Sequence, residues 1–153
     1  MQYFAYGNLL DIDVMRRVCP SARAVGVMEL NDYEIGFAKC ADPTQAGCTL
    51  DKAPGASMWG VQYELSDEDM AKLDKAAGVG KRDWVHHKVT VRDRNGASVE
   101  TMTYIIPEAS GPHAPPDAYV APIYKGAADF ELPADYIARL RALIEQAQGK
   151  NTA

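Results

Sequence analysis

The sequence predicts one α+β domain with a mostly antiparallel or mixed sheet. Strand-like and helix-like segments are mixed along the chain without a regular alternation, which disfavours a doubly wound sheet. The clearest pair of strands, 85–91 and 98–106, flanks Asn95-Gly96, a hairpin signal that predicts antiparallel neighbours. With 153 residues and 47% hydrophobic side chains, the chain has the size of one globular core. We therefore expect a single domain over residues 1–148 and a frayed tail at 149–153.

The first predicted elements are a short strand and a short helix. Residues 2–6 are aromatic-rich and end at Gly7, which is typical of a strand that runs into a tight loop. Residues 11–18 have acidic residues at the front and arginines at the back, and Pro20 lies just beyond them. This distribution complements the helix dipole and predicts a helix that stops before the proline.

Two β-prone runs follow, at residues 24–30 and 33–38. Asn31-Asp32 separates them and predicts a hairpin turn. Residues 39–56 are rich in Gly, Pro, Asp and Thr, so we expect a long loop with a short strand at 48–50. A loop of that length is often functional.

The middle of the chain predicts a strand followed by a capped helix. Residues 57–65 resemble a strand. Ser66, with Asp69 three residues later, resembles a capping box, and Gly78 is placed to end the helix.

Two further helices are expected in the last third of the chain. Pro116 is well placed to start a helix from about 117 to 125, although Pro122 limits its regularity. Pro133 starts an amphipathic helix with apolar residues at helical spacing, and Gly149 ends it.

Charge and cysteine content narrow the class of partner and the compartment. The net charge is −5 and the basic residues are scattered, so the chain lacks the electrostatic footprint of a nucleic-acid binder. Cys19, Cys40 and Cys48 suggest no disulfide framework, which suits a reducing compartment. No stretch of about 18 apolar residues occurs, so we expect a cytoplasmic protein with no membrane partner. The sequence leaves the oligomeric state open.

Metal and cofactor signals are weak. His86 and His87 are adjacent on a predicted strand and therefore point to opposite faces, and His113 lies alone in a proline-rich loop. The sequence contains neither a phosphate-binding loop nor a dinucleotide fingerprint. We expect no metal and no cofactor.

The strongest remaining local signal is the loop after the first strand. A loop that contains Gly7 lets backbone N–H groups turn toward a carboxylate ligand. The same glycine is equally compatible with an ordinary turn.

Several segments of the chain, the first of which includes this loop, occur in an order and spacing shared with a known protein family. They are Tyr3-Phe4-Ala5-Tyr6-Gly7, residues 15–20, 24–37, 59–65 and 73–79, Pro116-Asp117-Ala118-Tyr119, Gly126-Ala127, and residues 132–136. Together they resemble the γ-glutamylcyclotransferase-like (AIG2-like) family over nearly the whole chain. The resemblance implies a small mixed β-barrel-like sheet surrounded by helices.

The resemblance also implies a reaction. In such enzymes, backbone amides of the first loop hold a γ-glutamyl group, while a Glu transfers protons as the free amine attacks its own γ-carbonyl. The products are 5-oxoproline and a released amine or amino acid. The implied class is a transferase or lyase of glutathione metabolism that acts on a small γ-glutamyl-like molecule.

Some site positions keep the residue that the family pattern has. Tyr6, Gly7, Leu10 and Tyr119 match it, which implies that the loop and part of the pocket wall are retained. We therefore include these four among the predicted substrate-binding residues.

Other site positions depart from the pattern. In the ungapped register, Asn8 replaces Ser, Leu9 replaces Asn and Trp84 replaces Tyr, and these three complete the predicted binding set. Ala77 stands where the family has its catalytic Glu. Because alanine exchanges no proton, the resemblance implies a loss of about 10²- to 10⁴-fold in rate and a candidate pseudoenzyme.

Three hypotheses remain open from the sequence. The first is a binding protein with a pocket for a carboxylate-bearing small molecule and little or no turnover. The second is an active enzyme with a relocated acid/base, for which Glu64, Asp74 and Asp83 are candidates. The third is a structural or interaction protein whose pocket is filled by Leu9 and Trp84.

Overall fold

A computed structural model describes residues 1–150, whose strands form a mixed sheet that closes into a small barrel. The strands are β1 (Gln2–Ala5), β2 (Arg23–Lys39), β3 (Ala46–Glu64), β4 (Val85–Asp93), β5 (Ser98–Ile105) and β6 (Gly111–Pro112). The helices are α1 (Ile12–Val18), α2 (Asp67–Ala76), α3 (Asp117–Asp129) and α4 (Ala134–Ala147), with short 3-10 turns η1 (Asn8–Leu10) and η2 (Val79–Lys81). The predicted α+β class is confirmed.

The sheet closes because its longest strands pair with each other. The strand order is β3-β1-β5-β4-β2-β6, and a further pairing of β2 with β3 joins the two sides. β1 runs parallel to β5 and antiparallel to β3, so the barrel is mixed. The expected hairpin of β4 and β5 around Asn95-Gly96 is confirmed, with Val85 opposite Ile105 and Arg92 opposite Ser98.

The hairpin predicted at Asn31-Asp32 is wrong. β2 continues through both residues as one strand, and Asp32 takes a positive φ of 70° at an irregularity in the β2–β3 ladder. Asn31 pairs with Ser57 and Tyr33 with Lys52, so the extra residues of β3 bulge opposite Asp32. A residue that tolerates positive φ therefore bends a continuous strand here instead of reversing it.

The long loop predicted at 39–56 is also wrong for most of its length. β3 begins at Ala46, and the connection from β2 is a short turn in which the Cys40 N–H donates to Gln45 O at 2.8 Å. The Gly55 N–H donates to Asp32 Oδ1 at 2.9 Å, which holds the bulge together. Pairing with β2 therefore overrides the turn-forming composition of this segment.

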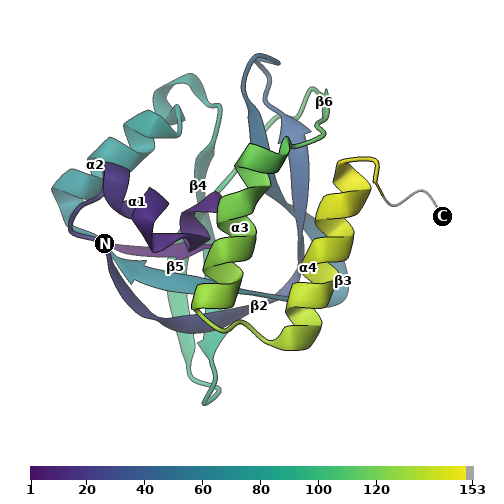
Figure 1. Cartoon of the computed structure of the whole chain (residues 1–153). Helices are drawn as coiled ribbons and strands as arrows, with labels where there is room; N and C mark the ends of the chain where they lie inside the picture. Colours follow the sequence, from purple (N-terminus) through teal and green to yellow (C-terminus); the bar gives the residue numbers. More distant parts are fainter. Residues whose placement is uncertain (151–153) are drawn as a thin grey trace.

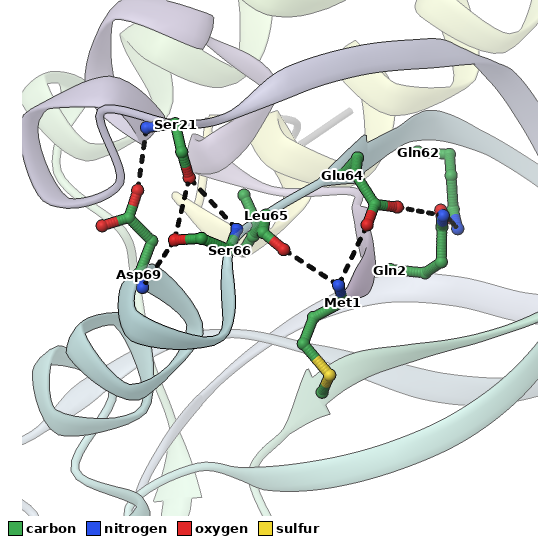
Figure 2. Close-up of polar contacts among 8 residues, drawn as sticks. All are labelled: Met1, Gln2, Ser21, Gln62, Glu64, Leu65, Ser66 and Asp69. Carbon is green, nitrogen blue, oxygen red and sulfur yellow. Dashed lines mark hydrogen bonds and ion pairs between the residues drawn. The ribbon is translucent and has the colours of Figure 1, made fainter.

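The start of α2 is held by the predicted cap. Ser66 Oγ accepts from the Asp69 N–H at 3.1 Å, and the Asp69 carboxylate accepts from the Ser21 N–H at 2.8 Å (Figure 2). The Ser21 hydroxyl accepts from the Ser66 N–H at 3.1 Å. These contacts tie α2 to the chain that leaves α1. At the other end, Gly78 follows the last turn with a φ of 65°, so the predicted helix end is confirmed.

The helices cover the barrel in two groups (Figure 1). α1 and α2 lie together on one side, while α3 and α4 pack side by side on another. α3 runs to Asp129, beyond its predicted end, with Pro122 inside it. None of the helices within residues 1–150 is long and apolar enough to cross a membrane.

Close packing of α3 against η1 fixes the loop after β1. A Cβ atom added to Gly126 would lie 2.3 Å from the Leu10 carbonyl carbon and 2.4 Å from its oxygen. Lys125 also binds Asp11 at 3.2 Å and Asp129 at 2.9 Å, which links the same helix to the start of α1. The glycine therefore permits a contact that positions the loop.

The predicted tail lies partly outside the described residues. Within them, the Lys150 N–H donates to Glu145 O at 2.8 Å, and Lys150 Nζ binds Asp117 at 2.8 Å. Residues 151–153 are not described.

Candidate functional site

A cavity of about 260 Å³ lies where the end of β1, η1, α1, β3 and the end of α2 meet. This volume is close to the lower end of the range for small-molecule sites. Its wall consists of Tyr3, Tyr6, Gly7, Asn8, Leu9, Val14, Val18, Cys48, Leu73, Ala76, Ala77, Trp84, Tyr104 and Tyr119. The segments that contribute are far apart in the sequence, so the barrel itself assembles the cavity.

The structure brings most of the predicted binding residues together in this wall. They are Tyr6, Gly7, Asn8, Leu9, Trp84 and Tyr119. Leu10 lies outside the wall, because it is fully buried in the core where Gly126 packs against it. Ala77 also lies in the wall. Binding by these residues remains a prediction.

We call the part of the wall built from Tyr6, Gly7, Asn8, Cys48 and Tyr119 the loop wall. Its close packing depends on glycines. A Cβ atom on Gly7 would lie 2.4 Å from Cys48 Sγ, and one on Gly47 would lie 2.6 Å from the Tyr119 hydroxyl. Neither contact leaves room for a side chain, so both glycines let the chain approach the aromatic residues closely.

The polar groups of the loop wall bind one another and the neighbouring wall residues Trp84 and Tyr104. The Cys48 N–H donates to the Tyr119 hydroxyl at 2.9 Å, and Trp84 Nε1 donates to Cys48 O at 2.9 Å. The Tyr6 hydroxyl donates to Tyr104 O at 2.7 Å. Side chains therefore satisfy the backbone of Cys48 on both sides and hold this part of β3 in place.

Burial keeps the loop wall uncharged. It raises the pKa of the Tyr6 and Tyr119 hydroxyls well above the usual value for tyrosine. Burial also raises the pKa of the Cys48 thiol, although hydrogen bonds from Tyr119 and the Asn8 backbone oppose that rise. The thiol therefore stays protonated at neutral pH and is a weak nucleophile.

The backbone N–H groups of η1 differ in their hydrogen bonding. The Leu10 N–H donates to Gly7 O at 3.0 Å and the Asp11 N–H to Asn8 O at 3.3 Å. Within residues 1–150, the Leu9 N–H forms no hydrogen bond with another backbone group. Leu9 lines the cavity, and backbone N–H groups of such a loop can bind an anion when they face it.

The helix wall, which we define as Leu73, Ala76 and Ala77 at the end of α2, differs in character. All three side chains are apolar, and Ala77 is the C-terminal capping residue. None of them accepts or donates a proton. The helix wall therefore contributes to the shape of the cavity and supplies no acid or base.

The three carboxylates considered as substitutes all lie outside the wall. Glu64 binds the N-terminal amine at 3.0 Å (Figure 2). Asp83 is 7% exposed, and its carboxylate lies against Gly78. Asp74 is the one that contacts a wall residue, because its carboxylate accepts from the Tyr104 hydroxyl at 2.5 Å.

Asp74 joins Tyr104 to a histidine at the surface. His86 Nε2 lies 2.7 Å from Asp74 Oδ1, and the His86 and Tyr104 rings are 5.6 Å apart. His86 is exposed, whereas burial, followed by the hydrogen bond to Asp74, raises the pKa of Tyr104 above its usual value. His87, the neighbour expected on the opposite face, lies 3.3 Å from the Tyr33 hydroxyl.

Sequence reasoning missed several wall residues. Tyr3 and Tyr104 enter the wall from adjacent strands, with ring centroids 5.3 Å apart, and Cys48 enters from a segment expected to be mostly loop. Val14 and Val18 come from α1 at the helical spacing of one face. That spacing was visible in the sequence, but the placement of Cys48 and Tyr104 depends on barrel closure.

A second hollow, the outer groove, lies between the β2–β3 ladder and α4. In contrast to the cavity, it contains charged groups: Arg139 binds Glu34 at 2.8 Å, and Asp51 lies opposite Glu34 across the ladder. Burial, and then the Glu34 charge, raise the pKa of Asp51. Arg139 therefore pairs with Glu34, whereas Asp51 and Glu34 repel each other.

Comparison with known proteins identifies similar chains. The model of the AIG2-like family matches residues 57–140. Gamma-glutamylcyclotransferase from Bos taurus is 29% identical over 147 residues, which covers 92% of this chain and 77% of the relative. The protein of that name from Homo sapiens is 28% identical with the same coverage.

Solved structures agree with these relatives. A structure of a gamma-glutamyl cyclotransferase superposes with a TM-score of 0.86 and 27% identity, covering 93% of this chain and 86% of the other. YkqA from Bacillus subtilis has a TM-score of 0.78 at 21% identity, covers 95% of this chain and 54% of the other, and supports the fold alone.

Proposed function

This chain belongs to the AIG2-like family, and we propose that its cavity binds a small molecule carrying a γ-glutamyl group or a related carboxylate. The observation that carries the proposal is the meeting of Tyr6, Gly7, Asn8, Leu9 and Tyr119 around one open cavity. We further propose that cyclotransferase activity, with release of 5-oxoproline, is lost or much reduced.

The loop wall supports the binding part of the proposal. The relatives are named gamma-glutamylcyclotransferases, and the family resemblance implies that amides of the first loop hold the γ-glutamyl group. Here the Leu9 N–H is free of other backbone groups within residues 1–150, and Gly7 keeps the loop close to Cys48. A ligand carboxylate that accepts from this loop would gain a charge-assisted hydrogen bond.

The helix wall supports the proposed loss of turnover. In the register that matches Leu73–Val79 to the family pattern, Ala77 takes the place of the catalytic Glu, and it faces the cavity. No acidic side chain belongs to the wall formed by residues 1–150. Removal of a positioned acid/base typically costs about 10²- to 10⁴-fold in rate.

Isothermal titration with two γ-amides, γ-glutamyl-L-alanine and glutaryl-L-alanine, tests the binding proposal. At least one should bind the wild-type protein with a Kd of about 1 mM or tighter, an affinity that corresponds to about −4 kcal/mol. Ala77→Trp, which fills the cavity, should abolish the heat signal while the protein stays folded by circular dichroism. Lack of binding by both compounds to the wild-type protein would refute the proposal.

One observation favours a second candidate, an active enzyme with a relocated acid/base. The contacts from Tyr104 to Asp74 and from Asp74 to His86 form a chain from the cavity wall to the surface. In this candidate the Tyr104 hydroxyl would exchange a proton with the ligand and Asp74 would exchange one with Tyr104. It ranks below the binding proposal because the raised pKa of Tyr104 makes its hydroxyl a weak acid.

The filled-pocket hypothesis is the least supported. Leu9 and Trp84 both line the cavity, yet a volume of about 260 Å³ remains between the walls. Trp84 is held at the edge by its hydrogen bond to Cys48 O, which keeps its ring in a fixed position. We also propose the cytoplasm as the location, consistent with the three unpaired thiols of Cys19, Cys40 and Cys48.

A further inference from the structure

The cavity wall formed by residues 1–150 carries no charged side chain of either sign. Its aliphatic part consists of Leu9, Val14, Val18, Leu73, Ala76 and Ala77. The Cys48 thiol, which stays protonated because burial raises its pKa, behaves as a small apolar group. The wall therefore offers a ligand mainly apolar surface and no countercharge.

The aromatic side chains of the wall present their rings rather than free hydrogen-bond donors. The Tyr6 hydroxyl donates to Tyr104 O at 2.7 Å, and the Tyr104 hydroxyl donates to the Asp74 carboxylate at 2.5 Å. Trp84 Nε1 donates to Cys48 O at 2.9 Å. Protein acceptors therefore occupy these donors, and the part that remains for a ligand is ring carbon together with hydroxyl lone pairs.

Such a wall disfavours charged groups inside the cavity. An ion that leaves water needs an opposite charge or several hydrogen bonds to offset the loss of hydration, and the wall has no opposite charge. The cavity is open on one side, so a charged group of the ligand can stay in water at its mouth. An uncharged apolar group, by contrast, gains free energy in proportion to the surface that it buries.

The volume of the cavity suits an apolar group of moderate size. A cavity of about 150 Å³ lined by Leu, Ile and Phe is large enough to bind benzene. The cavity of this protein, at about 260 Å³, therefore has room for an aromatic ring and the atoms that join it to the rest of a ligand.

The departures from the family pattern act in the same direction. In the register of the family resemblance, Leu9 replaces Asn and Ala77 replaces Glu, and both line the cavity. These two exchanges remove an amide and a carboxylate from the wall. Trp84, which replaces Tyr, adds a larger ring whose N–H is already bound to Cys48 O.

We propose that the cavity binds an uncharged apolar group of its ligand, such as an aryl or branched alkyl group, while the charged groups of the ligand stay at the open side. The inference rests on the proposed function and narrows its ligand class. The ligand is a γ-glutamyl or related carboxylate compound in which the amide partner is an apolar amine or amino acid.

The test compares two dipeptides that carry the same charged groups, γ-L-glutamyl-L-phenylalanine and γ-L-glutamyl-L-alanine. Isothermal titration of the wild-type protein at neutral pH gives the ratio of their dissociation constants, which measures the contribution of the phenyl ring. We expect the phenylalanine compound to bind at least about tenfold more tightly, because burial of its ring removes apolar surface from water. Titrations at several temperatures should also give it the more negative heat-capacity change.

A polar substitution in the wall shows where the ring binds. Leu9→Asn places an amide in the wall and should lower the ratio severalfold. Leu143→Asn is the matched control, because it makes the same change at a half-buried position outside the wall and should leave the ratio unchanged. Should Leu9→Asn not fold, Val14→Thr exchanges a methyl group of the wall for a hydroxyl with little change in shape and should also lower the ratio.

The possible outcomes separate this inference from the proposed function. If the wild-type protein binds the alanine compound but prefers the phenylalanine compound less than tenfold, the ligand class is wrong while the binding function stands. A ratio that is unchanged by the wall variant, or lowered equally by Leu143→Asn, would also contradict the inference, because the ring would then bind outside the cavity. If neither dipeptide binds, the binding function itself fails.

Discussion

The loop wall and the helix wall enclose one cavity, yet they use their residues in different ways. In the loop wall, glycines allow close approach, and Tyr119 and Trp84 satisfy the backbone of Cys48. The helix wall is formed by the last turn of α2, and its three side chains are apolar. The difference indicates that the fold maintains a closely packed, hydrogen-bonded wall on one side and an apolar wall without a group for proton transfer on the other.

The largest effect should come from the support of the loop wall. Gly126→Ala places a methyl group 2.3 Å from the Leu10 carbonyl carbon, so the backbone of η1 or α3 must move. We expect a loss of about 3 kcal/mol of stability, at the upper end of the usual cost of overpacking. Chemical denaturation measures it. Gly80→Ala, beside the helix wall, is the control, because no atom lies within 4 Å of the added methyl group.

If Gly126→Ala lowers the free energy of unfolding no more than Gly80→Ala does, the contrast between the loop wall and the helix wall is wrong. It would mean that the contact between α3 and η1 does not determine the shape of the loop wall.

A smaller effect is expected at Tyr119. Tyr119→Phe removes the acceptor for the Cys48 N–H and leaves that donor without a partner. Such a loss costs about 1 to 3 kcal/mol, and we expect about 2 kcal/mol together with weaker ligand binding. The control is Tyr124→Phe on the same helix, whose hydroxyl forms no hydrogen bond within residues 1–150. Equal denaturation midpoints for the two variants would argue against the role of Tyr119.

The smallest effect is expected at the start of α2. Ser66→Ala removes the cap of the Asp69 N–H and should cost about 1 kcal/mol, while Ser66→Asn should restore most of the stability. Ligand affinity should not change, because Ser66 lies at the opposite end of α2 from the helix wall. A change in affinity with unchanged thermal stability would show that the two ends of the helix are coupled in a way that the contacts do not explain.

Local signals in the sequence predicted the elements whose ends are determined by neighbouring residues. Asn95-Gly96 specified the β4–β5 hairpin, and Ser66 and Gly78 marked the two ends of α2. The same reasoning failed at Asp32 and over residues 39–56. There, pairing between β2 and β3 determines the conformation, and the local sequence pattern does not show which strand a segment will pair with.

The candidate site shows the same limit. The loop residues and Tyr119 were proposed through the family resemblance, and Leu10 was included because it matches the family pattern, although it is buried. Tyr104 and Cys48 were missed because the barrel brings them to the cavity from distant strands. The hydrogen bond between Asp74 and Tyr104 likewise depends on the packing of α2 against the barrel, which sequence spacing does not reveal.

The central claim is that the cavity binds its ligand without turning it over, and the most direct measurement is 5-oxoproline release from γ-glutamyl-L-alanine by the purified protein. We predict a rate indistinguishable from that of the Ala77→Trp control, because neither wall places an acid or base at the ligand. Turnover by the wild-type protein at ordinary enzyme rates, about 1 to 10³ per second, would contradict the claim. If Asp74→Asn then abolished that turnover while ligand binding persisted, the chain of contacts through Tyr104 would be established as the relocated proton-transfer group.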